Sequence, residues 1–197
     1  MGARHFFNRE SAKDKRERKE RERKEALNRS NRHGTNLFFK AVESGKLSEV
    51  AQGLREGADI MARTTQRGFF SSMAASTPYN IGATPLHAAC LLGSPDIVSF
   101  LIEKGADPEA KDDAGHTPLD YAILGHGYYQ SDLTRKESSR FIMQHFVDKA
   151  AGRVEKFEQV IEKLLDRKVQ PAMFEMPEKF RDAQNAKRNR PLTPPLP

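Results

Sequence analysis

The chain has 197 residues, 37% of them hydrophobic, and a formal net charge of +6 at pH 7. This length fits one domain with appendages, and the low apolar content predicts that part of the chain is unpacked. A single cysteine excludes an internal disulfide, and neither a signal-peptide core nor a run of about 18 apolar residues occurs. We therefore expect a soluble protein without a membrane segment, located in the reducing cytoplasm or alternatively in the nucleus.

The first predicted segment is a charged arm over residues 1–35, with 12 basic and 6 acidic side chains. Residues 13–25 contain no apolar residue, so they have no face to bury. Glutamates that precede a basic residue by four positions allow a solvated helix here, and disorder is the alternative. A nucleic-acid tail is a further interpretation, but the interleaved glutamates would cancel much of the attraction for phosphate, so we expect no nucleic-acid partner.

A repeat follows in the middle of the chain. The sequence GATPLHAACLLG of residues 82–93 returns as GHTPLDYAILGHG of residues 115–127, and the Thr-Pro-Leu triplet recurs after 33 positions. Thr84 can cap a helix that opens with Pro85. Between the two copies, Ile97, Val98, Leu101 and Ile102 lie on one stripe of a second helix that Gly105 can end. The pattern predicts helical hairpins.

Residues 80–112 resemble the ankyrin repeat, with its TPLH motif, two short helices and a closing Gly-Ala-Asp. The resemblance implies an all-α fold, a short ankyrin-repeat solenoid over residues 36–148, with β-turn fingers projecting between its repeats. It also implies that His87 makes a hydrogen bond between neighbouring repeats, with Asp120 at that position in the next one. The expected divisions are a capping repeat at 36–63, an insertion at 64–78, repeat two at 79–112 and repeat three at 113–148.

Two insertions interrupt this register. Asp59 precedes Thr84 by 25 residues, whereas Asp107 precedes Thr117 by only 10, so fifteen residues have been added at a finger. About eleven more, around YYQSDLTRKES, are expected between the two helices of repeat three. Phe141, Ile142 and Phe146 would then continue the apolar stripe of its second helix. The paired aromatics Phe69-Phe70 and Tyr128-Tyr129 fall within the insertions, where they either cover an open end of the stack or contact a partner.

Two segments follow the repeats. Residues 149–169 predict an amphipathic helix, because Val154, Phe157, Ile161, Leu164 and Leu165 share one face. This helix either caps repeat three or pairs with a second copy, so we expect a monomer or a weak dimer. Residues 170–197 read as an extended proline-rich tail. Within it, Arg188, Pro191 and Pro194 fit the R-x-x-P-x-x-P pattern of SH3 ligands.

No motif for catalysis is present. The histidines lack a ligand spacing, and no phosphate loop, nucleophile elbow or zinc-protease motif occurs, so we expect no enzyme, metal or cofactor. The ankyrin resemblance implies a protein-interaction module or scaffold that binds an unidentified protein through its fingers and concave face. A nucleic-acid-associated regulatory adaptor using the basic ends and a bacterial effector acting on a host protein are the alternatives. The predicted partner-binding residues are Phe69, Phe70, Asn80, Ile81, Leu91, Leu92, His116, Tyr128 and Tyr129.

Overall fold

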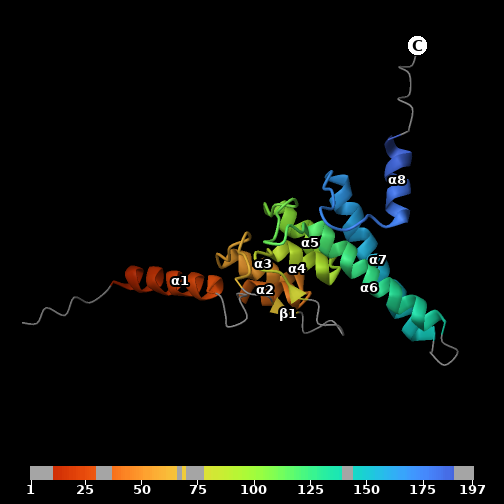
Figure 1. Ribbon diagram of the computed structural model, residues 1–197. Helices are drawn as coiled ribbons and strands as arrows, with labels where there is room; N and C mark the ends of the chain where they lie inside the picture. The colour runs from red at the N-terminus through yellow and green to blue at the C-terminus, as the bar shows by residue number, and fades with distance from the viewer. Residues whose placement is uncertain (1–10, 30–36, 66–67, 70–77, 139–143, 189–197) are drawn as a thin grey trace, which may run out of the picture.

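The computed structural model describes residues 11–29, 37–65, 68–69, 78–138 and 144–188 (Figure 1). None of the helices in these ranges is long and apolar enough to cross a membrane. The helices and strands, in chain order, are α1 (Ala12–Asn28), α2 (Leu37–Glu43), α3 (Leu47–Arg55), β1 (Gly68–Phe69), β2 (Pro78–Tyr79), α4 (Pro85–Leu92), α5 (Pro95–Glu103), α6 (Pro118–Glu137), α7 (Gln144–Asp166) and α8 (Glu178–Arg188).

Three helical hairpins stack side by side: α2 with α3, α4 with α5, and α6 with α7 (Figure 1). The first helices of the hairpins contact one another in chain order, and so do the second helices. In the part of the chain that the structure describes, strand structure is limited to the short pair β1 and β2. The all-α solenoid predicted from the sequence is confirmed.

The centre of the stack is α4. Thr84 and Pro85 begin this helix, and Gly93 ends it in the left-handed conformation with a φ of 65°. All seven side chains from Pro85 to Leu91 are buried, because α4 contacts α2, α5 and α6. The expectation that Leu91 lines an open concave side is therefore wrong, since Leu91 is 0% exposed and belongs to the core.

The first insertion extends a β-hairpin finger. Strands β1 and β2 are antiparallel, with Gly68 opposite Tyr79. At the base of the finger the Thr64 N–H donates to the Ala83 carbonyl at 2.9 Å, and the Thr64 carbonyl accepts from the Gly82 N–H at 2.8 Å. The Thr64 hydroxyl also donates to the Asn80 carbonyl at 2.7 Å. Thr64, which the sequence analysis placed in the insertion, is thus part of the finger base.

The inserted aromatics of this finger are largely outside the described residues. Phe69 belongs to β1, but its side chain is not among the described ones, and Phe70 lies wholly outside them. The prediction that this pair contacts a partner stays a prediction.

The second insertion is helical rather than a loop. Helix α6 continues without a break from Pro118 to Glu137, so Tyr128 and Tyr129 lie on a helix. Helix α7 is also continuous, and it joins the end of the expected repeat three to the expected separate helix at 149–169. Phe146 is 50% exposed and does not continue the apolar stripe, while Phe141 and Ile142 fall outside the described residues.

Helix α7 packs against α6 and α5 through its apolar face. Its buried side chains include Val154, Phe157, Ile161 and Leu164, four of the five predicted to share that face. The Phe157 ring enters a niche where two glycines leave room: a Cβ built on Gly93 would approach it to 2.8 Å, and one built on Gly125 would overlap it. Helix α7 is therefore the second helix of repeat three, packed against α6 and against α5 of repeat two, rather than a separate cap.

Beyond α7 the chain folds back on the stack. We call residues 169–188 the strap; it consists of an irregular segment and α8, with Val169 and Phe180 buried. The expectation of an extended tail is therefore wrong for this part, because Val169 and Phe180 are buried against the stack. Arg188 ends α8, whereas Pro191 and Pro194 of the predicted SH3 ligand lie outside the described residues.

At the other end, α1 projects from the first repeat as an exposed charged helix (Figure 1). A capping box formed by Ser11 and Asp14 begins it. Only its last turns touch the stack: Arg23 pairs with Glu56, and the Asn28 side chain accepts from the Asp59 N–H at 2.8 Å. The solvated helix expected within the arm is present.

Candidate partner-binding site

A buried polar network holds two fingers together. They are the β1–β2 finger before repeat two, called the second finger, and the finger before repeat three, called the third. Asp112 is its centre: one carboxylate oxygen accepts from the Asn80 side chain at 2.8 Å and from the Tyr121 hydroxyl at 2.9 Å. The other accepts from the backbone N–H groups of Ala114 and His116, each at 2.9 Å. The Tyr121 hydroxyl in turn accepts from the Asn80 N–H at 3.0 Å. Two fingers and the first turns of α6 are therefore tied to one carboxylate.

Electrostatics favour the charged form of this carboxylate. Burial acts to raise the pKa of Asp112, but the hydrogen bonds from Asn80, the His116 N–H and Tyr121 outweigh it and hold the pKa below its usual 3.8. Burial raises the pKa of Tyr121, so its hydroxyl keeps its proton and remains a donor. The network is complete at neutral pH, which fixes the fingers before any partner arrives.

The outer side of this network carries exposed apolar and charged groups. Ile81 is 42% exposed at the second finger. Phe174 of the strap is 37% exposed and places its ring 5.6 Å from the His116 ring. Arg63, on the other arm of the second finger, reaches across to the next finger and donates to the Lys111 carbonyl at 2.7 Å. We call this surface the finger edge; its members are Arg63, Asn80, Ile81, Asp113, His116 and Phe174.

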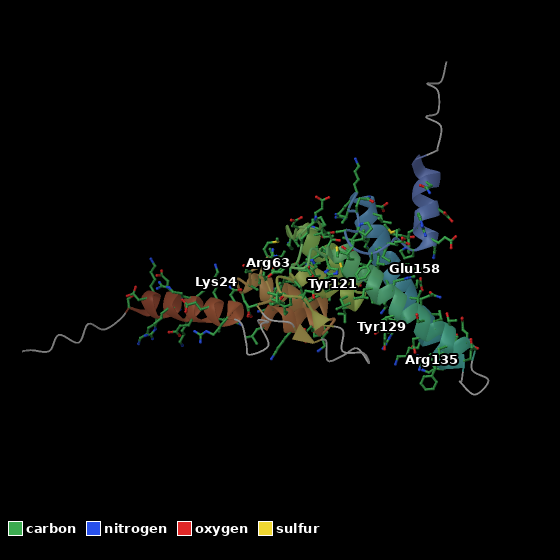
Figure 2. The ribbon with its side chains drawn as sticks, in the orientation of Figure 1. Lys24, Arg63, Tyr121, Tyr129, Arg135 and Glu158 are labelled. Carbon is green, nitrogen blue, oxygen red and sulfur yellow. The ribbon has the colours of Figure 1, made fainter. Side chains whose placement is uncertain are left out.

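The structure separates the predicted partner-binding residues into two groups. Asn80, Ile81 and His116 come together on the finger edge. Leu92 and Tyr129 instead line a groove of about 360 Å³ on the side of the hairpin turns. In Figure 2, Tyr129 lies further along α6 than Tyr121, away from Arg63.

The tyrosine pair has a structural role in this hairpin. Tyr129 is only 8% exposed, stacks on Phe157 with ring centroids 5.4 Å apart, and lies under the Arg153 guanidinium at 5.1 Å. Tyr128 is partly buried and meets the Tyr129 ring edge to face. Burial leaves Tyr129 little surface to offer a partner, so the finger edge is the better candidate site.

Sequence reasoning missed the residues that complete the finger edge. Phe174 was assigned to an extended tail, and Asp112 and Tyr121 were not singled out. Asp120 was the available signal, since an acidic side chain at the histidine position of TPLH indicates a different hydrogen-bond partner. The apolar residues Met176 and Phe180 of the tail were a second signal, because such side chains favour burial, and the structure buries Phe180 and partly buries Met176.

The imidazole of His87 and the thiol of Cys90, the two groups with the most reactive chemistry, are buried in the core. His87 accepts from the Thr84 N–H at 3.1 Å through Nδ1, and its Nε2 lies 3.1 Å from the His116 carbonyl. Burial lowers the pKa of His87 to about 4, so it is a neutral link between repeats, as the resemblance implied. Burial also raises the pKa of the Cys90 thiol. Among the described residues, no group of three or more potential ligands can hold a metal ion.

Comparison with known proteins agrees with this geometry. Residues 38–131 match the family model for ankyrin repeats in three copies. Residues 38–131 form an ankyrin-repeat domain. The chain is 37% identical over 100 residues to mouse protein phosphatase 1 regulatory subunit 27, covering 51% of this chain and 55% of that protein.

Two further relatives are similar over shorter stretches. Rabbit transient receptor potential cation channel subfamily V member 5 is 42% identical over 74 residues, which are 36% of this chain and 10% of the channel. Pig NF-kappa-B inhibitor alpha is 46% identical over 43 residues, 22% of this chain and 14% of the inhibitor. The ankyrin-repeat chain spans about half the length of the phosphatase subunit and a small part of the other two.

Proposed function

We propose that this ankyrin-repeat chain is a non-catalytic adaptor that binds a protein partner through the finger edge. One observation carries the proposal: exposed apolar side chains, Ile81 and Phe174, lie on a surface that a buried network around Asp112 holds in place. A surface fixed before binding loses little conformational entropy when a partner docks. The buried free thiol of Cys90 suits a reducing compartment, so a cytoplasmic location is part of the proposal.

The energetics of this surface favour recognition of an apolar side chain. Burying a large apolar side chain contributes about 1.5–3 kcal/mol, so Ile81 and Phe174 together can dominate a modest interface. Arg63 and Asp113, both about half exposed, lie beside them and can select a partner with complementary charge. The finger edge therefore combines an apolar centre with a polar rim, as protein interfaces do.

The first partner to test is protein phosphatase 1. Support comes from the phosphatase regulatory subunit, whose similarity to this chain extends over 100 residues. Because the chain spans only 55% of that relative, the phosphatase is part of the proposal rather than a known partner.

The test compares exposed residues on and off the finger edge. Replacing Ile81 and Phe174 with Ser should weaken binding to purified protein phosphatase 1 catalytic subunit by at least about tenfold in calorimetry, because two apolar contacts are lost. The matched control is Phe146→Ser, which removes an aromatic of comparable exposure near the start of α7, away from the finger edge. A third variant, with Phe69 and Phe70 both changed to Ser, tests the prediction for the inserted pair. Thermal melts of every variant should coincide with wild type.

The outcomes separate the candidate surfaces. Binding that is lost only with Phe146→Ser would move the site to the hairpin and overturn the proposal. If the wild-type chain does not bind the phosphatase, cross-linking from cell lysate with the same variants tests the finger edge against other proteins. A captured protein whose yield is the same for all variants would also count against the finger edge.

A further inference from the structure

The strap occupies the place of a missing fourth finger. In repeat two, Nε2 of His87 reaches the backbone carbonyl of His116 in the next finger. In repeat three the equivalent residue is Asp120, and its carboxylate accepts the backbone N–H groups of Ala172, Met173 and Phe174, each at 3.0 Å. The exchange of histidine for aspartate fits a segment that presents donors rather than a carbonyl. The strap is thus held by one buried anchor that also caps α6.

A second cluster holds α8 at its own end. Phe180 is buried and meets the His126 ring edge to face with centroids 6.2 Å apart. Nε2 of His126 is buried without a hydrogen-bond partner among the described residues and lies 3.7 Å from a carboxylate oxygen of Glu158. The other oxygen of Glu158 accepts from the Lys179 ammonium at 2.6 Å. Helices α6, α7 and α8 therefore meet at a histidine whose ring nitrogen is covered by the strap.

We propose that His126 makes the strap an acid-sensitive cap, docked when the imidazole is neutral and released as it takes up a proton. Release would remove Phe174 from the finger edge and uncover the flank of α6 and α7. The charged groups that face His126 are Glu158 of α7 and Lys179 of α8. Glu158 is already paired with Lys179, so its charge is partly neutralised and stabilises a protonated His126 less.

The direction of the pH effect is set by burial. Burial lowers the pKa of His126 below its usual 6.5, and this outweighs the opposing effect of Glu158. When the strap is released, the ring meets water and regains an ordinary pKa. The released state therefore binds the proton more readily, so docking is strongest above pH 6.5 and weakens as the pH falls below it.

Hydrogen exchange on the full chain measures this directly. Peptides covering residues 170–182 report release through their protection factors, corrected for the intrinsic effect of pH on exchange. From pH 7.5 to 5.5 the wild-type protection should fall by up to about tenfold, the limit for one histidine that stays neutral when docked. The test uses no partner, so it does not depend on the proposed function.

His126→Gln is the decisive variant, because glutamine is neutral throughout this range. Its strap should show the same protection at both pH values. His116 also touches the strap through Phe174, and this variant leaves His116 in place. An equal pH-dependent fall in wild type and variant would overturn the proposal.

A measurement on the unmodified chain covers the case in which the glutamine variant docks poorly. The ring proton signals of His126, followed by NMR, should titrate below pH 6.5. Titration at or above 6.5 would mean that burial does not hold the imidazole neutral, and it would overturn the proposal independently of any variant.

Discussion

At the residue scale, one position of the repeat motif uses two chemistries. His87 and Asp120 both follow Thr-Pro-Leu and both cap their own helix. His87 reaches toward a carbonyl of the next finger, whereas Asp120 accepts from three backbone N–H groups of the strap. The side chain at this position therefore matches the backbone group that faces it: histidine where the next segment offers a carbonyl, and aspartate where it offers N–H groups.

The buried histidine predicts a pH dependence of the global stability. Because burial lowers the pKa of His87 to about 4 from 6.5, the folded state binds fewer protons than the unfolded state between these values. Stability is thus fully present above pH 6.5 and is lost as the pH falls toward 4. Between pH 7 and 5 the free energy of unfolding in urea should fall by about 2 kcal/mol from this residue.

The control is His87→Gln, which keeps a residue suited to the third position of a capping box but does not titrate. Its free energy of unfolding should depend less on pH than that of wild type by the stated amount. Equal slopes for the two proteins would show that His87 is not held neutral in the fold.

Sequence reasoning was right about His87 and wrong about Leu91, and the reason is physical. The partner of His87 is another copy of its own repeat, so the repeat period predicts it. The exposure of Leu91 depends on everything that packs around α4, and no local pattern contains that information. Sites that depend on packing between distant segments, such as Phe174 beside His116, cannot be predicted from the sequence for the same reason.

At the element scale, the hairpin of α6 and α7 differs from the sequence prediction. That prediction places an insertion of about eleven residues, around YYQSDLTRKES, between the two helices of repeat three. Helix α6 instead continues, supported by an i,i+4 pair between Asp132 and Lys136 at 2.6 Å. Gly125 is present because Phe157 needs its space, which a helical pattern alone does not reveal.

Gly125 and Gly127 of α6 predict opposite effects of the same substitution. Gly125→Ala should lower the free energy of unfolding by about 1–3 kcal/mol, because the new methyl group overlaps the Phe157 ring. Gly127→Ala should raise it by about 0.5–1 kcal/mol, since nothing lies within 4 Å and alanine favours the helix. Chemical denaturation measures both. Effects of the same sign at the two positions would contradict the continuous helix or the Phe157 niche.

At the scale of the whole molecule, the repeats depend on the C-terminal part of α7. Truncation after Asp148 cuts this helix and removes the buried side chains Val154, Phe157, Ile161 and Leu164. At about 1.5–3 kcal/mol for each, the loss is comparable to the whole stability of a small domain. The truncated chain should therefore melt without cooperativity or aggregate, as circular dichroism and size-exclusion chromatography would show.

A chain that ends at Arg188 is the matched control, because it keeps α7 and the strap. Its melting temperature should stay within a few degrees of wild type. If the chain that ends at Asp148 melted cooperatively at the wild-type temperature, α7 would instead be an accessory helix, free to bind another molecule.

The two-armed finger has a practical consequence for engineering. Thr64 hydrogen-bonds to Ala83 and Gly82 at the base, and Gly68 lies opposite Tyr79 further out. A new tip that lengthens both arms by the same number of residues keeps this pairing, so the side chains below the tip stay on their own faces. A library of such tips could be displayed on the unchanged stack, and new binders could be selected from it.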